Sequence, residues 1–212
     1  MPAALYVPTN LVTAAVVVFI SRRLVTPYDM GMTNWARGAR WGLAVTLVGL
    51  GVYLVAAVTP GFDELFNDRR VGDGLPRLFY EVFIRIPLGT VLLEEVAFRG
   101  ALPAVFEKHW SRLHAVVMSS MLFGLWHVLP SLNLADVNPV FEGLLGTGLA
   151  GKIGGVAIAV VGTFLVGLWL CFLRYRSGSI LAPLIVHTAS NTGGYVLAFL
   201  FGGAVISTDI GT

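Results

Sequence analysis

Residues 92–99 read Leu92-Leu93-Glu94-Glu95-Val96-Ala97-Phe98-Arg99, and they place two adjacent carboxylates at the end of a long apolar run. An ionisable side chain in the hydrocarbon of a bilayer costs at least about 2.5–3.5 kcal/mol on insertion scales. Such residues therefore face the interior of a helix bundle, where they usually mark function. This stretch predicts a functional site inside a membrane bundle, provided that the rest of the chain supplies the other spans.

The composition of the whole chain supports this prediction. Of its 212 residues, 56% are hydrophobic and only 12% are charged, and the mean hydropathy is +0.80. A soluble domain carries about 25% charged residues, so most of this surface is expected to face lipid. A net charge of +2 calls for no nucleic acid or other acidic partner. The single cysteine, Cys171, excludes an intramolecular disulfide and any CxxC metal motif.

Six apolar runs flank or contain this stretch; the first five are near the length of about 20 helical residues that crosses a bilayer, and the sixth is longer and rich in glycine. They cover roughly residues 3–21, 41–60, 78–98, 114–132, 153–173 and 179–203. We therefore predict an all-α, polytopic transmembrane helix bundle. It would comprise two N-terminal spans with their loops (1–77), a membrane core (78–203) and a short tail (204–212). The segments 61–77 and 133–152 are expected to be outer loops or short interfacial helices.

The distribution of basic residues predicts the orientation of the spans. No basic residue precedes the first run, which is the reverse of a secretory signal, so we expect this run to be retained as a span. If it ends in the cytoplasm, nine of the fourteen basic residues lie on inner segments: Arg22, Arg23, Arg37, Arg40, Arg99, Lys108, Arg112, Arg174 and Arg176. The positive-inside rule then places both termini outside.

Two further polar pairs lie within the predicted spans. Phe123 and His127 are four residues apart, as are His187 and Asn191, so each pair shares one helix face. Each pair alone has an ordinary explanation, such as a packing histidine or an amide that joins two helices. With a rise of 1.5 Å per residue, however, the motifs of three separate spans reach overlapping depths, roughly 12–22 Å from the face where each span enters. One shared site is a simpler explanation than three coincidences.

These residue types suit amide hydrolysis by an activated water. A buried carboxylate and a neutral imidazole can together bind and deprotonate water, and a second histidine with an asparagine can donate to a developing oxyanion. A serine or cysteine nucleophile is disfavoured, because Ser190 lies on a different face from His187 and Cys171 has no paired base. The HExxH zinc motif is absent. Zinc bound by Glu94, His127 and His187 nevertheless remains chemically open.

Three motifs, in this order, resemble the signature of the CAAX-processing and bacteriocin-processing (CPBP, or Abi) family of intramembrane endopeptidases. The motifs are Glu94-Glu95-x-x-x-Arg99, Phe123-x-x-x-His127 and His187-x-x-x-Asn191. The resemblance covers about residues 78–203, which would be the catalytic core, whereas the first two spans match only in being hydrophobic.

The resemblance implies a role for each motif residue. Glu94 would be the general base that activates water, His127 would share that water, and His187 and Asn191 would form the oxyanion hole. Glu95 and Arg99 would be a supporting pair that fixes the carboxylate geometry, with Phe123 packed beside His127. No metal and no other cofactor are implied, since family members are regarded as glutamic peptidases.

The function expected from this resemblance is a glutamic, CAAX protease-like intramembrane endopeptidase in a bacterial cell membrane. Its partners would be membrane lipid and a peptide or protein substrate, either a membrane-associated peptide or a lipidated protein terminus. A non-catalytic scaffold or bacteriocin-immunity protein is the main alternative. A zinc-dependent peptidase and a proton-coupled transporter are less favoured, the transporter because the chain shows no inverted repeat.

Overall fold

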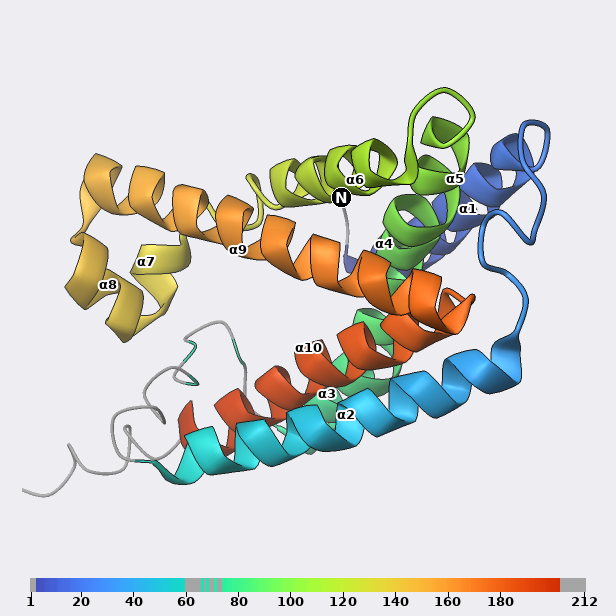
Figure 1. The fold of residues 1–212 in the computed structure, drawn as a ribbon. Coiled ribbons are helices and arrows are strands. Elements are labelled where there is room, and N and C mark those ends of the chain that lie inside the picture. Colours follow the sequence, from blue (N-terminus) through green and yellow to red (C-terminus); the bar gives the residue numbers. More distant parts are fainter. Residues whose placement is uncertain (1–2, 60–65, 67, 69–70, 72–73, 203–212) are drawn as a thin grey trace, which may run out of the picture.

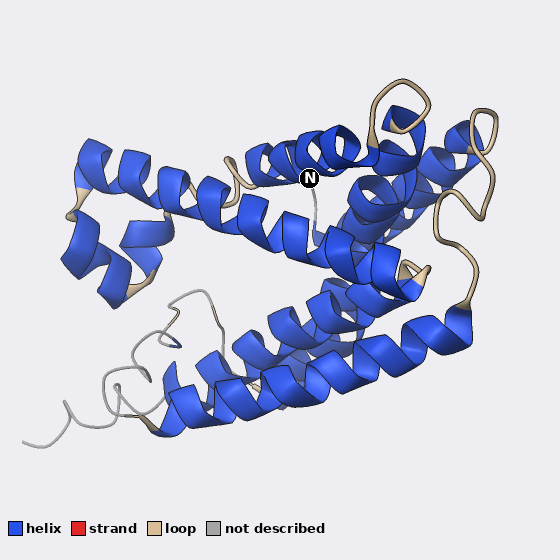
Figure 2. Ribbon diagram, viewed as in Figure 1, coloured by secondary structure: helices blue, strands red, loops and turns tan. Residues whose placement is uncertain are grey.

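The computed structural model describes residues 3–59, 66, 68, 71 and 74–202. Within these ranges the chain forms helices and connecting loops and no strand (Figure 2). The prediction of an all-α bundle is confirmed. The predicted tail, 204–212, and most of the predicted outer loop between the second and third spans lie outside the described residues.

Six long helical segments follow one another along the chain, with two short helices before the fifth. They are α1 (Ala3–Ser21), α2 (Trp35–Val58), a continuous helix from residue 75 to residue 106, α6 (Arg112–Trp126), α7 (Leu134–Val137), α8 (Pro139–Leu145), α9 (Gly148–Ser177) and α10 (Leu181–Gly202). The short α7 and α8 lie in the segment that was expected to hold interfacial helices.

Three of the described helices are long and apolar enough to cross a membrane by themselves: α1 from Ala4, α2 and α9. Much of the apolar surface of α2 is exposed, including Leu47 and Val48, each 70% accessible. Burial inside the protein cannot explain such a helix, whereas contact with lipid can. The remaining long segments are shorter, interrupted or more polar, and α10 carries the polar run from His187 to Thr192. The chain is a membrane protein.

The third long helix alternates between α-helical and π-helical winding, with one π-helical segment before the two glutamates and one after them. It consists of α3 (Leu75–Tyr80), the π-helical η2 (Glu81–Val91), α4 (Leu92–Glu95), the π-helical η3 (Val96–Ala101) and α5 (Leu102–Phe106). Proline lacks the N–H that an α-helix requires, and Pro87 lies inside η2 while Pro103 follows η3. Wide π turns are rare in helices and frequently occur at functional sites.

Two helix pairs dominate the packing, α2 with α10 and α6 with α9 (Figure 1). Glycine permits the close approach of α2 to α10 and to the turn before it: a Cβ atom at Gly42 would lie 2.9 Å from the Cβ of Ile185 on α10, and one at Gly38 would lie 2.7 Å from the Cβ of Ser179 in that turn. Small residues four apart commonly allow membrane helices to pack closely. The helix α9 ends at Gly178, which has a positive φ. This turn lets the chain reverse its direction before α10 begins.

The fourth helix is shorter than the sequence predicted. The expected span 114–132 ends at Trp126, and two turn hydrogen bonds of the i→i−3 type follow, at His127 and Val128. Pro130 explains this end, because a proline ring clashes with the carbonyl four residues before it and cannot donate to that carbonyl. His127 therefore lies in a turn at the end of α6, not within a helix.

Two glycines four residues apart, Gly151 and Gly155, lie at the start of α9. A Cβ atom at Gly151 would lie 2.2 Å from the carbonyl oxygen of Gly146, and one at Gly155 would lie 3.4 Å from the Cβ of Leu134. The two glycines therefore allow α9 to pack against the segment that contains α7 and α8.

Candidate active site

The two glutamates of the first motif are buried on the third long helix. Glu94 is 5% exposed, and Glu95 is fully buried together with Arg99. The guanidinium of Arg99 lies 3.0 Å from Oε1 of Glu95, and its central carbon lies 3.9 Å from the centre of the Phe123 ring. A buried carboxylate must be paired, since an isolated buried charge is very costly. The predicted Glu95–Arg99 pair is therefore present, and Phe123 packs on it.

His187 of α10 lies between the two carboxylates. Its Nδ1 donates to Oε1 of Glu95 over 2.8 Å, and its Nε2 lies 3.7 Å from Oε2 of Glu94. Glu95 thus contacts both Arg99 and His187, which makes it more central than its position on the helix face of Arg99 had suggested. The four groups form a buried chain in which acidic and basic side chains alternate.

His127 approaches the same cluster from the end of α6. Its Nδ1 lies 2.8 Å from the carbonyl oxygen of Phe123, and because a carbonyl only accepts, Nδ1 carries the proton. The last carbonyls of a helix lack partners within the helix, so the side chain of His127 caps α6. The Phe123 ring packs against both histidines, with centroid distances of 4.7 Å to His127 and 5.9 Å to His187. The Nε2 of His127 remains available as a proton acceptor.

Trp126 is a contact that the sequence reasoning did not identify. Its indole N–H donates to Oε1 of Glu94 over 3.0 Å, and its ring packs edge-on against Phe98 with centroids 5.9 Å apart. The residue lies directly before His127, and an indole N–H in an apolar run is a polar group that needs a partner when buried. The sequence could therefore have indicated that Trp126 needs a hydrogen-bond partner, but not that the partner is Glu94, 32 positions away.

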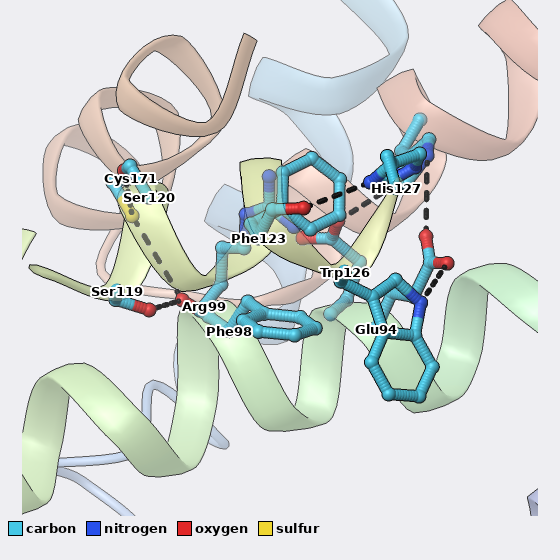
Figure 3. A network of polar contacts seen from close by, with 11 residues as sticks. Glu94, Phe98, Arg99, Ser119, Ser120, Phe123, Trp126, His127 and Cys171 are labelled. Carbon is cyan, nitrogen blue, oxygen red and sulfur yellow. Dashed lines mark hydrogen bonds and ion pairs between the residues drawn. The ribbon is translucent and has the colours of Figure 1, made fainter. Parts of the chain in front are cut away.

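A second group of contacts holds the third long helix to α6 and α9 (Figure 3). The carbonyl of Phe98 accepts a hydrogen bond of 2.6 Å from Ser119 and a longer contact of 3.9 Å from Cys171. The N–H of Leu102 bonds to Ala97, and Pro103 has no N–H to offer, so the carbonyl of Phe98 depends on these side chains. The π-helical η3 thereby becomes an attachment point for two neighbouring helices.

Asn191 lies one turn beyond His187 on α10, but outside the buried chain. Among the described residues no hydrogen bond joins its amide to Glu94 or Glu95. Its side chain is exposed and lines a cavity of about 360 Å³ together with residues of α2, of α10 and of the segment that follows α2: Tyr53, Phe66, Asp68, Val71, Ser190, Gly194, Tyr195 and Ala198. The structure therefore brings together all the predicted site residues except Asn191, which borders this cavity.

The side chains of Ser190 and Cys171, the two residues disfavoured as nucleophiles, contact other groups than the histidines. The hydroxyl of Ser190 pairs with the hydroxyl of Tyr53 at 2.8 Å, not with a histidine. Cys171 is 1% exposed, and its sulfur contacts Ser120 and the carbonyl of Phe98. Within the described part of the chain, no group of three or more histidine, cysteine or acidic side chains is arranged to hold a metal ion.

Comparison with known proteins identifies the part of the chain that contains these residues. Positions 76–193, which contain all three motifs, match the model of the family described as type II CAAX prenyl endopeptidase Rce1-like. The chain belongs to this Rce1-like family. An uncharacterized 24.3 kDa protein of Escherichia coli is 28% identical over 202 residues, which cover 92% of this chain and 78% of that protein. No solved structure matches the chain.

Membership in the Rce1-like family bears out the resemblance carried by the three motifs. It makes the chain a CAAX protease-like membrane enzyme, in agreement with its apolar helices. The matched region begins near the start of the third long helix, so α1 and α2 lie before it. Both helices nevertheless support the site, α1 by contact with η2, α4 and η3, and α2 by contact with α10.

Proposed function

We propose that this protein is an intramembrane endopeptidase of the glutamic type, in which Glu94 and His127 activate the attacking water. The observation that carries the proposal is the meeting of three distant motifs in one cluster around the buried Glu94, Glu95 and His187. Glu94 and Glu95 come from the third long helix, Phe123, Trp126 and His127 from the end of α6, and His187 from α10.

The two proton acceptors of the cluster are available to a water molecule. Within the described residues, Oε2 of Glu94 is buried and has no hydrogen-bond partner, and Nε2 of His127 is left free by the bond from Nδ1 to Phe123. A water held between them would give a proton to Glu94 while its oxygen forms a bond with the carbonyl carbon of the substrate. The carbonyl π electrons move onto oxygen and produce the tetrahedral oxyanion.

Collapse of this intermediate breaks the C–N bond, and the departing nitrogen takes the proton that Glu94 received. The products are a carboxylic acid and an amine, which become a carboxylate and an ammonium when the acid proton moves to the amine, and Glu94 returns to its starting state. His187 and Asn191 would provide the oxyanion donors. His187 donates to Glu95 through Nδ1, so donation to the oxyanion from Nε2 would require the doubly protonated imidazolium. Asn191 would act from the next turn of α10.

The substrate class that the family suggests is a prenylated protein terminus with a CAAX sequence. A site reached from within the bilayer suits a substrate that is itself anchored in lipid. A membrane-associated peptide without a prenyl group satisfies the same chemistry. We also expect the protein to reside in a bacterial cell membrane, as its E. coli relative suggests.

Mass spectrometry of membrane peptides, compared between cells with wild-type protein and cells with Glu94→Ala, tests catalysis and identifies the substrate together. We expect at least one cleaved terminus in wild-type cells to be replaced by its uncleaved precursor in the variant. Glu81→Gln is the matched control, because Glu81 lies on the same helix with similar burial, 6% against 5%, and is paired with Arg85 instead. Unchanged cleavage in the Glu94 variant would refute the glutamic mechanism and favour a scaffold or immunity function. Metal analysis of the purified protein tests the zinc alternative.

A further inference from the structure

Trp126 connects the end of α6 to the carboxylate of Glu94. The indole N–H donates to Oε1 over 3.0 Å, and the Phe98 ring supports the indole from the side. Trp126 as a whole residue is 51% exposed. The contact thus joins a residue at the surface of the helix bundle to a buried carboxylate of the proposed catalytic site.

The two oxygens of Glu94 have different surroundings because of this contact. Oε1 is held by Trp126, whereas Oε2 is buried without a hydrogen-bond partner among the described residues. Oε2 also lies 3.7 Å from Nε2 of His187, which is longer than a hydrogen bond. The carboxylate is therefore held in an orientation that leaves one oxygen unoccupied.

We propose that Trp126 is a positioning residue, whose indole N–H holds the Glu94 carboxylate so that Oε2 is the oxygen that receives the proton from water. This proposal rests on the proposed glutamic mechanism and extends it to an unspecified position of the second motif, Phe123-x-x-x-His127. Trp126 acts through Glu94 and takes no part in bond making or breaking.

The physical reason lies in the freedom of the glutamate end group. The terminal torsion of a glutamate side chain is broad and roughly two-fold, so an unheld carboxylate rotates easily. Without the N–H bond, Oε2 could close the 3.7 Å gap to His187 and form a direct ion pair. That ion pair would occupy both the proton acceptor and the Nε2 proposed to face the oxyanion. In a buried, weakly polar environment a charge-assisted hydrogen bond is strong enough to prevent this rotation.

Trp126 also adjoins His127 at the point where α6 ends. Because Pro130 stops the helix at Trp126, one turn delivers both the donor that holds Glu94 and the imidazole that shares its water. A displacement of this turn would move both groups together. Phenylalanine at this position could not hold Glu94 in this way, because it has no N–H to donate.

Kinetics of the purified protein on a quenched fluorogenic peptide ending in a farnesylated CAAX sequence test the proposal. For Trp126→Phe we expect kcat to fall about 10- to 100-fold, as for loss of one hydrogen bond to a charged group, with KM within about twofold of wild type because substrate contacts are unchanged. Benzothienylalanine at position 126, which keeps the two-ring shape and lacks the N–H, is expected to show the same loss. Trp110→Phe is the control, since Trp110 has a similar exposure of 47% and stacks only against Phe106 among the described aromatic rings.

The outcomes separate this proposal from the mechanism on which it rests. If Glu94→Ala is inactive while benzothienylalanine at position 126 retains full kcat, the positioning role is refuted and the glutamic mechanism stands. If Glu94→Ala cleaves the peptide, the mechanism itself falls. A rise in KM alone would make Trp126 a substrate contact and would also refute the positioning role.

A measurement without substrate gives a second test. The ultraviolet resonance Raman band that reports indole N–H bonding, assigned to Trp126 by its loss in Trp126→Phe, should shift towards weaker bonding in Glu94→Ala. It should be unchanged in Glu81→Gln. An identical band in wild type and Glu94→Ala would show that the hydrogen bond is absent and would overturn the proposal.

Discussion

The site has a buried side and an open side, which differ in how far their side chains are exposed. On the buried side, Arg99, Glu95, His187 and Glu94 are at most 7% exposed and form a chain in which basic and acidic side chains alternate. On the open side, Trp126, His127 and Asn191 end a helix or border a cavity. Glu95 and Arg99 on the buried side stabilise the helix arrangement by pairing their charges, whereas Oε2 of Glu94, Nε2 of His127 and the amide of Asn191 are the polar atoms proposed to meet water and substrate. Substitution of the Glu95–Arg99 pair is therefore expected to lower stability, and substitution of the other groups to lower activity.

The largest expected effect falls on the open side, and it should affect activity alone. His127→Ala removes the proposed second water ligand, and we expect kcat to fall about 10²–10⁴-fold, the range for general acid–base groups. Thermal unfolding in detergent should stay close to wild type, because His127 is only partly buried and makes one hydrogen bond. His109→Ala, in an exposed turn, is the control. A large loss of stability in His127→Ala would contradict the division into two sides.

The buried side should show the opposite pattern. Arg99→Met leaves Glu95 as a buried charge with one partner fewer, and breaking a buried pair from one side costs about 3–5 kcal/mol. We expect a correspondingly lower unfolding temperature in detergent. The double variant Arg99→Met with Glu95→Gln removes both charges and should recover much of the stability. If the single and double variants are equally unstable, charge pairing is not what stabilises this side.

The packing of α2 against α10 should have a smaller effect on the buried side. A Cβ at Gly42 would lie 2.9 Å from the Cβ of Ile185, two residues before His187 on α10. Gly42→Val should lower stability by about 1–3 kcal/mol, the range for overpacking, and should also lower kcat by displacing His187. Gly51→Val is the matched control on the same helix, since nothing lies within 4 Å of its Cβ position. Equal unfolding temperatures for the two variants would count against close packing at Gly42.

The smallest effect is expected outside both sides, in the loop between α1 and α2. Hydrogen bonds from the hydroxyl and backbone N–H of Thr26 hold the pKa of Asp29 below its ordinary 3.8. A lowered pKa stabilises the folded state above pH 3.8, and this contribution disappears as the pH falls through the folded-state value. Asp29→Asn should therefore cost about 0.3 kcal/mol near pH 7, since the group is exposed and screened, and nothing below its folded-state pKa.

Unfolding temperatures of wild type and Asp29→Asn, measured from pH 7 down to pH 2.5, check this prediction. The two curves should converge at the acid end while the site variants remain separated from wild type. Curves that run parallel through the whole range would show that the Asp29 carboxylate contributes nothing through its charge.

Local patterns in the sequence were sufficient to predict the helix class and most of the site. Apolar runs identified α1 with its observed bounds, and four-residue spacings identified the Glu95–Arg99 pair, because both depend on neighbours along one helix. The same spacing predicted that Asn191 lies one turn beyond His187 on the same helix, which the structure confirms. These relations depend only on neighbours along one helix.

Contacts between helices could not be predicted in this way. The position of His187 between Glu94 and Glu95, the bond from Trp126 to Glu94 and the dependence of the Phe98 carbonyl on Ser119 each join residues far apart in the chain. Spacing along one helix gave the Glu95–Arg99 pair, but it could not give the partners of the two glutamates on other helices.

By itself, the sequence determined that this protein is a helical membrane bundle with acid–base groups buried inside it, because hydrophobicity and the cost of buried charge act residue by residue. Only the tertiary structure decided which of those groups are already paired and which remain available. Pairing depends on distances between helices, and the close approach of α2 to α10, the stop of α6 at Trp126 and the wide turns beside Glu94 set those distances together.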